Sequence, residues 1–126
     1  MNLILLDIDG TLVDSLKLEN LYFPQAVRET LGLSIINTDW SRFTNPTDSG
    51  IIREIMREEL SQLCHPKHIE KCRERFIELL SGHLDQYPDA LAPIPGAHAF
   101  VEYLEHHDQY EFAVATDGWR FTSEMK

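Results

Sequence analysis

Residues 3–15, with the sequence LILLDIDGTLVDS, decide the fold of this protein. They begin with a short apolar run, residues 3–6, which has the length of a buried β-strand. Two carboxylates, Asp7 and Asp9, and then Gly10 interrupt the run. A continuous apolar strand is typical of a parallel sheet that is covered on both faces, and such sheets bind ligands beyond the carboxyl ends of their strands. The two acids are therefore expected at a ligand-binding edge.

Asp7 and Asp9 also predict the chemistry of that edge. Residues two apart in an extended chain point the same way, so both carboxylates are expected on one side. Like charges this close repel each other, and a proton or a cation must neutralise them. A hard divalent cation with oxygen ligands, Mg²⁺ first among them, fits this requirement. Gly10 permits a tight turn directly after the acids.

Residues 7–15 resemble the first motif of the haloacid dehalogenase-like hydrolases, Asp-x-Asp-Gly-Thr-Leu-x-Asp-Ser, at every fixed position. The resemblance implies that Asp7 is a nucleophile that becomes an aspartyl-phosphate, and that Asp9 protonates the leaving group and then activates water. It also implies that the Asp7 carboxylate and the Asp9 backbone carbonyl hold Mg²⁺. An acid at position 9 is similar to the phosphatases and phosphomutases of the family, because its true dehalogenases lack it. The implied activity is hydrolysis of a small phosphorylated metabolite.

A second apolar run, residues 112–115, predicts another buried strand, which ends in Thr116, Asp117 and Gly118. Exposed N–H groups at the start of a following helix attract anions, so phosphate binding there is chemically reasonable. The family resemblance implies that Thr116 donates its hydroxyl to a phosphate oxygen and that backbone N–H groups around Asp117 and Gly118 add donors. The family more often has Asn at position 117, and Asp adds negative charge near the phosphate. The following helix is expected to reach Lys126.

Helical spacing of apolar residues predicts four helices between the two runs. They cover residues 15–31, residues 47 or 48 to about 63, residues 66 to about 84, and residues 96–107. Pro24 should kink or split the first, which Gly32 ends. Leu63 is expected on the apolar face of the second helix and Phe100 on that of the fourth, and residues 33–46 form a loop.

This order of elements predicts the α/β class, with a core of two parallel strands and an inserted α-helical cap. By resemblance, this core is expected to be the Rossmann-like core of the haloacid dehalogenase-like family, here incomplete, and it comprises residues 1–14 and 92–126. The cap comprises residues 15–91 and, by resemblance, closes over the site and excludes water. The loop at residues 40–49 is where capped members usually contact substrate. The candidates there are Thr44, Asn45, Asp48 and Arg53, although helix capping by Thr47 or Asp48 is an alternative explanation.

Cys64, His65, His68 and Cys72 are four soft-metal ligands in one short stretch, which raises the question of zinc. Pro66 restricts the backbone between them, and Cys72 falls on the apolar side of its helix. A core cysteine with surface histidines is the favoured interpretation.

Composition places limits on the partners. The 126 residues correspond to one domain, and a formal net charge of −10 argues against a nucleic-acid surface. The same charge repels phosphorylated substrates, so a metal or local positive groups must attract them. Two cysteines are too few for a disulfide framework, and the N-terminal apolar run is too short for a signal peptide or membrane span. The predicted location is the cytoplasm.

The main departure from the family lies at the C-terminal end. A Lys that holds the nucleophile and acids that complete the metal site belong to later strands, and Lys126, Asp14, Asp108 and Glu124 do not match them. Two of the four motifs are therefore present, and we predict weak Mg²⁺ binding, very low turnover by this chain alone and possible self-association through the incomplete sheet. A non-catalytic binding module and a phosphomutase are the alternatives.

Overall fold

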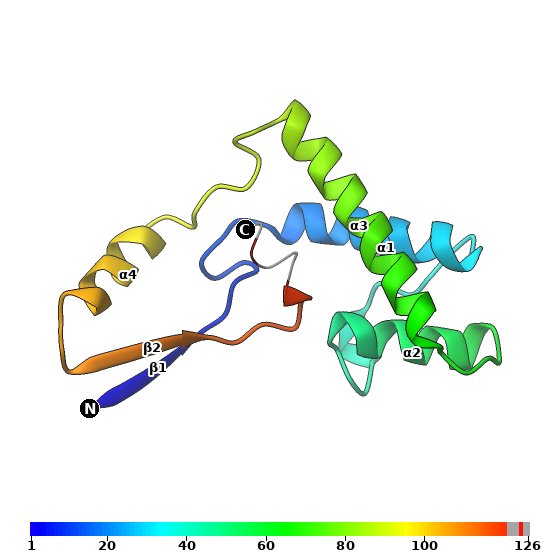
Figure 1. The fold of residues 1–126 in the computed structure, drawn as a ribbon, viewed down its shortest axis with the longest axis horizontal. Coiled ribbons are helices and arrows are strands. Elements are labelled where there is room, and N and C mark those ends of the chain that lie inside the picture. Colours follow the sequence, from blue (N-terminus) through cyan, green and yellow to red (C-terminus); the bar gives the residue numbers. More distant parts are fainter. Residues whose placement is uncertain (121–123, 125–126) are drawn as a thin grey trace.

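The computed structural model describes residues 1–120 and 124, and it has two parts (Figure 1). In one part β1 (Asn2–Leu6) and β2 (Tyr110–Val114) lie beside α4 (Ala97–Glu105), and the other part contains α1 (Leu16–Leu31), α2 (Asp48–Glu59) and α3 (Pro66–Gln86). A 3₁₀ turn, η1 (Trp40–Arg42), interrupts the loop before α2. The predicted α/β class with two parallel strands is confirmed. Most of the last predicted helix, residues 121–123 and 125–126, lies outside the described residues.

The two strands pair in parallel, so their carboxyl ends meet at one edge. Asn2 lies opposite Tyr110 and Leu6 opposite Val114. The N–H of Ala115 donates to the carbonyl of Leu6 at 2.8 Å, which extends the ladder by one bond. The residues after β1 and those after β2 therefore emerge side by side, as the sequence predicts.

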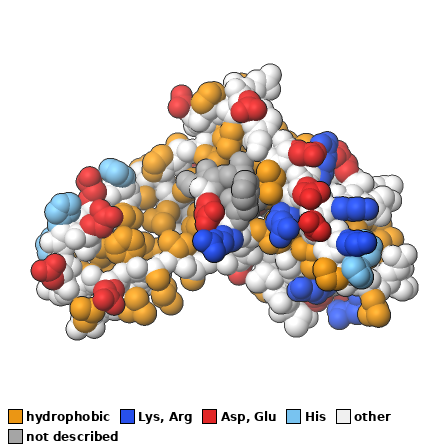
Figure 2. Space-filling model, viewed as in Figure 1, with side chains coloured by type: hydrophobic (Ala, Val, Ile, Leu, Met, Phe, Trp, Pro, Cys, Tyr) orange, Lys and Arg blue, Asp and Glu red, His pale blue; other side chains and the backbone are white. Residues whose placement is uncertain are grey.

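The expected burial of both strands is wrong for this chain. The side chains of Leu3 and Leu5 are each 65% exposed, and of the strand residues only Leu6 is buried. The reason is that α4 packs against one side of the sheet, and the opposite face has no cover from the described residues. Figure 2 shows apolar side chains at the surface of this part. Phe100 of α4 was expected to be buried and is 45% exposed, whereas Leu104 is buried.

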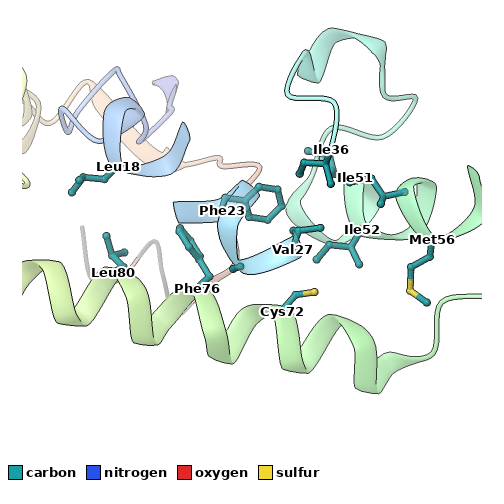
Figure 3. Packing of buried hydrophobic residues seen from close by; sticks show 12 residues of the cluster. Leu18, Phe23, Val27, Ile36, Ile51, Ile52, Met56, Cys72, Phe76 and Leu80 are labelled. Atoms are coloured by element: carbon teal, nitrogen blue, oxygen red, sulfur yellow. The ribbon is translucent and has the colours of Figure 1, made fainter. Parts of the chain in front are cut away.

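The hydrophobic core lies among the three helices of the other part (Figure 3). Phe23 of α1 meets Phe76 of α3 edge to face, with ring centroids 5.9 Å apart, the arrangement that aromatic quadrupoles favour. The remaining buried members of the cluster come from the same helices and the loop before α2: Leu18, Ala26, Val27, Ile36, Ile51, Ile52, Ile55, Met56, Cys72 and Leu80. Burial of these apolar faces is what stabilises the helices.

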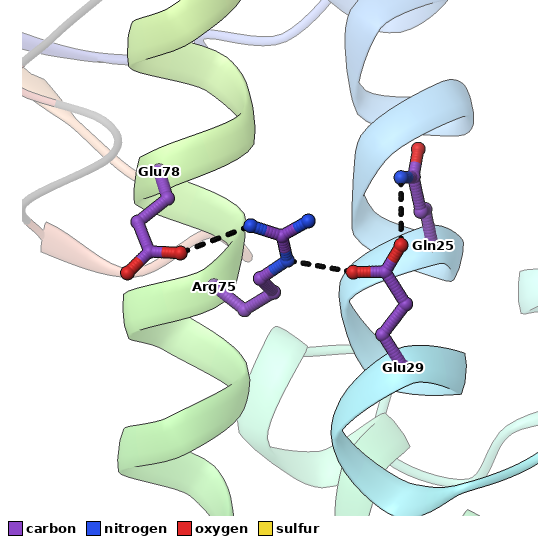
Figure 4. A network of polar contacts seen from close by, with 4 residues as sticks. All are labelled: Gln25, Glu29, Arg75 and Glu78. Carbon is purple, nitrogen blue, oxygen red and sulfur yellow. Dashed lines mark hydrogen bonds and ion pairs between the residues drawn. The ribbon is translucent and has the colours of Figure 1, made fainter.

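A polar network ties α1 to α3 outside this core (Figure 4). The Nε of Arg75 donates to Glu29 across the helix pair at 2.6 Å, and its Nη1 donates to Glu78 at 3.0 Å. Gln25 donates to the other oxygen of Glu29 at 2.8 Å. These hydrogen bonds hold the pKa of Glu29 below its usual value.

The helix ends follow the sequence signals closely. Gly32 ends α1 in the left-handed conformation, with φ of 71°, and Thr47 caps α2 by accepting the N–H of Gly50 at 3.1 Å. α1 is nevertheless one uninterrupted helix, so a split at Pro24 is wrong, because Pro24 is buried and its packing offsets the lost backbone bond. Leu63 lies beyond the end of α2 and is 94% exposed.

The two parts are joined by two segments that hydrogen-bond to each other. The N–H of Asp14 donates to the carbonyl of Ala92 at 2.8 Å, and the N–H of Ile94 donates to the carbonyl of Leu12 at 2.9 Å. The chain thus leaves the sheet part and returns to it at one place, beside the loop that carries Asp7 and Asp9. The domain boundaries at residues 14 and 92 stay a prediction. Within the described residues, no helix combines the length and the apolar character that crossing a membrane requires.

Candidate active site

A pocket of about 220 Å³ opens where the sheet part meets the helical part. Asp7 and Asp9, at the end of β1, share its wall with Asp117 and Gly118, which follow β2. The first turn of α2 contributes Asp48. Two predicted motifs that lie far apart in the sequence are therefore brought to one cavity.

The loop after β1 is compact because its backbone is hydrogen-bonded within itself. The carbonyl of Ile8 accepts the N–H groups of residues 11–13 at 3.0 to 3.1 Å, and the N–H of Gly10 donates to Val13 at 2.8 Å. Gly10 has φ of 76°, and a Cβ there would lie 2.6 Å from the Cδ1 of Leu16. Only glycine meets both conditions without strain, which confirms the predicted turn.

Two hydroxyl groups of this loop orient the two acids. The Oγ1 of Thr11 donates to Oδ2 of Asp7 at 3.2 Å, and the Oγ of Ser15 donates to Oδ1 of Asp9. Ser15 is fully buried, so its hydroxyl has a fixed position. Our sequence analysis assigned no role to either hydroxyl. Both residues are fixed positions of the motif at residues 7–15, so the motif could have indicated a role for them.

The loop after β2 is tied to the first turn of α2. The N–H of Asp48 donates to the carbonyl of Asp117 at 3.0 Å, and Oδ2 of Asp48 accepts the N–H of Trp119 at 3.1 Å. Thr116 accepts the N–H of Gly118 through its Oγ1 at 3.1 Å. Of the three predicted phosphate-binding residues, Asp117 and Gly118 line the pocket, and Thr116 is outside its lining.

The pocket is strongly acidic. Its lining includes the carboxyl groups of Asp7, Asp9, Glu19, Asp48 and Asp117, and none of the described residues that line it is Lys, Arg or His. Several carboxylates around one cavity repel an anion and attract a cation. A phosphorylated ligand therefore requires a cation in this pocket, as the net charge already indicated.

The donor set suits Mg²⁺, although it is small. Asp7 and Asp9 offer hard oxygen ligands, and Mg²⁺ commonly binds through one or two carboxylates while it keeps several waters. Among residues 1–120 and 124, no group of three or more acidic, His or Cys side chains has the arrangement of a metal site. The two aspartates fit a weak, largely hydrated ion, and the Mg²⁺ itself stays a prediction.

The predicted substrate residues are not all brought to this pocket. Asp48 lines it, but Arg53 lines a different pocket between α2 and α3. The backbone N–H groups of Thr44 and Asn45 donate to the buried carboxylate of Glu54 at 3.1 and 3.2 Å. The first of these bonds is the main cause that keeps the pKa of Glu54 below its usual value. Thr44 and Asn45 thus hold the loop in place, and their contact with substrate stays a prediction.

The helical part contributes a pocket wall that our sequence analysis did not assign. Leu16, Asn20 and Phe23 lie on one side of α1, at helical spacings of three and four residues, and Trp40 covers them from η1. The Nε1 of Trp40 donates to Oδ1 of Asn20 at 3.3 Å. The helical spacing was visible in the sequence, but the position of η1 over α1 is tertiary.

Of the four Cys and His residues near α3, Cys72, His65 and His68 have structural roles. Cys72 is fully buried in the hydrophobic cluster, and burial raises the pKa of its thiol to about 11. His65 and His68 form a capping box, in which Nδ1 of His65 accepts the N–H of Lys67 and Nδ1 of His68 accepts the N–H of His65. The core cysteine is as predicted, and the histidines cap a helix.

Residues 4–126 match the family model of the haloacid dehalogenase-like hydrolases. The chain belongs to this family. No curated protein matches it in sequence. The match begins inside β1 and includes both loops that line the acidic pocket, so this hydrolase family is also the one that residues 7–15 resemble.

Two solved structures share the fold of this haloacid dehalogenase-like chain. A hydrolase from Pseudomonas syringae aligns with a TM-score of 0.70 and 18% identity, over 98% of this chain and 53% of that one. A predicted phosphoglycolate phosphatase from Haemophilus somnus 129PT aligns with a TM-score of 0.57 and 18% identity, over 94% and 52% of the two chains. The chain thus spans about half the length of these two proteins.

Proposed function

We propose that this protein is an Mg²⁺-dependent phosphomonoester hydrolase that acts through an aspartyl-phosphate on Asp7. The observation that carries the proposal is the meeting of Asp7 and Asp9 with Asp117 and Gly118 in one pocket. Membership of the haloacid dehalogenase-like hydrolases supports the reaction class. A structural neighbour described as a predicted phosphoglycolate phosphatase supports a small phosphorylated metabolite as substrate.

In the first step, a carboxylate oxygen of Asp7 attacks phosphorus, and the bond between phosphorus and the leaving oxygen breaks. Asp9 gives its proton to that oxygen, so the alcohol leaves neutral. In the second step Asp9 takes a proton from water, the water oxygen attacks phosphorus, and the bond to Asp7 breaks. The products are inorganic phosphate and the regenerated carboxylate of Asp7.

The neighbouring hydroxyl groups keep the two acids in place during these steps. Thr11 holds Oδ2 of Asp7, and Ser15 holds Oδ1 of Asp9. Correct placement of the reacting groups supplies a large part of the catalytic effect in such reactions. Mg²⁺, held by the Asp7 carboxylate and the Asp9 backbone carbonyl, would neutralise the negative charge of the phosphoryl group in this acidic pocket.

The loop after β2 would hold the phosphoryl oxygens. The Oγ1 of Thr116 accepts the N–H of Gly118, so the hydroxyl keeps its own hydrogen to donate to a phosphate oxygen. Asp117 and Gly118 line the pocket, and the backbone N–H of Asp117 would add a donor there. Phe23 and Trp40 form the apolar wall on the helical side, and this wall supports the proposed role of residues 15–91 as a cap that excludes water.

A non-catalytic metal-binding module is the second candidate function. It is favoured by the acidic lining of the pocket, where none of the described residues offers a positive side chain to a phosphate. Such a module would bind Mg²⁺ at Asp7 and Asp9 without transferring a phosphoryl group.

The test compares wild type with Asp7→Asn and with Asp14→Asn, a matched exposed acid on the same loop. Wild type and Asp14→Asn should bind Mg²⁺ weakly in a calorimetric titration and release p-nitrophenol from p-nitrophenyl phosphate very slowly. Asp7→Asn should lose the turnover and bind Mg²⁺ roughly tenfold more weakly.

A phosphoenzyme trap separates the two candidate functions. Acid quenching with ³²P-labelled acetyl phosphate should give a hydroxylamine-sensitive adduct on wild type and none on Asp7→Asn. Metal binding without any adduct or turnover would favour the binding module. Equal turnover in wild type and Asp7→Asn would contradict the role of Asp7.

A further inference from the structure

A second pocket, of about 380 Å³, lies between α2 and α3 on the helical part. Ser49 and Arg53 contribute to it from one side of α2, and Ile69 and Arg73 from one side of α3. Both pairs are four residues apart, the spacing that places side chains on the same face of a helix. Two arginines from different helices therefore share one cavity.

These two arginines differ from the other arginines of the same helices. Among the described residues, neither Arg53 nor Arg73 forms an ion pair, whereas Arg57 pairs with Glu54 and Glu58, and Arg75 pairs with Glu29 and Glu78. Of the described residues that line the second pocket, Glu70 is the only acid, so the cavity carries an excess of positive charge in a chain of net charge −10. Figure 2 shows that Lys and Arg side chains on that face gather mainly over the helical part.

Two further groups suit the cavity to an anion. The Oγ of Ser49 accepts the indole N–H of Trp119 at 2.8 Å, so its own hydrogen stays available to a ligand. Burial raises the pKa of the Cys64 thiol, which keeps this group neutral and adds no negative charge. Ile69 provides an apolar surface beside these donors.

We propose that this pocket binds a small metabolite through an oxyanion, a phosphate or carboxylate group, held between the guanidinium groups of Arg53 and Arg73. Guanidinium groups match such oxyanions with paired hydrogen bonds, and the volume is within the range of small-molecule sites. The site is separate from the acidic pocket, because Ser49 lines one cavity and Asp48 the other, on either side of the first turn of α2. Arg53 then serves this second site rather than the pocket of Asp7.

The test is a calorimetric titration with inorganic phosphate and, separately, with succinate, in EDTA so that no metal draws anions to Asp7 and Asp9. Wild type should bind at least one of the two, and the preferred one identifies the phosphate or the carboxylate class. Arg53→Ala and Arg73→Ala should each weaken this binding roughly tenfold or more. Arg57→Ala on α2 and Lys71→Ala on α3 remove the same charge outside the pocket and should leave the affinity unchanged.

An NMR signal from a residue beside the pocket shows where the anion binds. The indole N–H signal of Trp119, distinguished from that of Trp40 in a Trp40→Phe variant, should shift on titration, because Ser49 accepts its hydrogen bond. Asp7→Asn should show the same shift, so failure of the proposed hydrolase leaves this result standing. Absence of saturable binding with both anions would overturn the proposal, as would equal losses in the Arg57→Ala and Lys71→Ala controls.

Discussion

The sheet part of this protein has a higher proportion of apolar residues along its elements than the helical part, yet it buries fewer of them. The helices α1, α2 and α3 enclose a cluster that includes Phe23, Ile52 and Phe76, each with almost no exposed surface. In the sheet part, by contrast, Leu3 and Leu5 project into solvent. The difference shows that three amphipathic helices can cover one another, whereas two strands present two faces and α4 covers one.

This difference in burial affects both the stability of the fold and the candidate site. Apolar surface stabilises only where it leaves water, so the folding free energy is concentrated in the helical part. The proposed catalytic acids, Asp7 and Asp9, however, follow β1 in the sheet part. The loop at residues 7–15 therefore connects a well-packed region to a poorly covered one. Self-association through the exposed sheet face stays a prediction on the same grounds.

The largest expected effect is on the helical cluster. Phe76→Ala removes a fully buried ring between α1 and α3 and should lower the free energy of unfolding by about 3–5 kcal/mol. Leu5→Ala removes a similar apolar side chain from the exposed sheet face and should change it by less than about 0.5 kcal/mol. Urea unfolding followed by circular dichroism at 222 nm measures both. Equal losses in the two variants would mean that the sheet face is covered in solution.

An intermediate effect is expected at the junction of the two parts. Ser15→Ala removes a fully buried hydroxyl that donates to Asp9, and it should cost about 1–2 kcal/mol of stability and also weaken Mg²⁺ binding. Thr11→Ala removes the exposed bond to Asp7 and should cost clearly less. Urea unfolding and Mg²⁺ titration of the two variants give the comparison. A larger loss in Thr11→Ala would contradict the positioning role of Ser15.

The smallest effect is expected from the polar network on the surface of the helical part. The hydrogen bonds of Gln25, and then of Arg75, lower the pKa of Glu29 in the folded chain. Stability from this carboxylate is therefore complete above its ordinary pKa and is lost as the pH falls through the lowered one. The difference in Tm between wild type and Arg75→Gln should be small at neutral pH and should shrink below about pH 5. A difference that grows in acid would contradict this assignment, and Lys71→Gln is the matched control.

Much of the fold could be predicted because its signals are local. The helix ends at Gly32, Thr47 and Pro66 depend on caps within a few residues, and these were found. The predicted split at Pro24 and the predicted place of Leu63 on the second helix were wrong, because tertiary packing or an earlier helix end decided the outcome. The burial of the strands was mispredicted because an apolar run indicates that a strand tends to be buried. It does not show whether another element covers that strand.

The candidate site likewise has residues that the sequence predicts and residues that only packing brings together. The residue types and spacing at positions 7–15 identified the acids, the turn at Gly10 and the family, because the conformation of a short motif depends on its own residues. Which residues of the helical part face these acids depended on how α1, η1 and α2 pack against one another. Trp40 and Asn20 reach the acidic pocket through that packing, and the same packing directs Arg53 to another cavity.

The sequence by itself thus determined the two strands, most of the helix ends, the acids and the family, since each depends on residues close together in the chain. Only the tertiary structure decided which residues of the helical part meet the acids, which apolar face stays exposed and where Arg53 and Arg73 come together. The physical reason is distance along the chain: Asp9 and Trp40, or Arg53 and Arg73, meet through the packing of whole elements, and local propensity does not specify that packing.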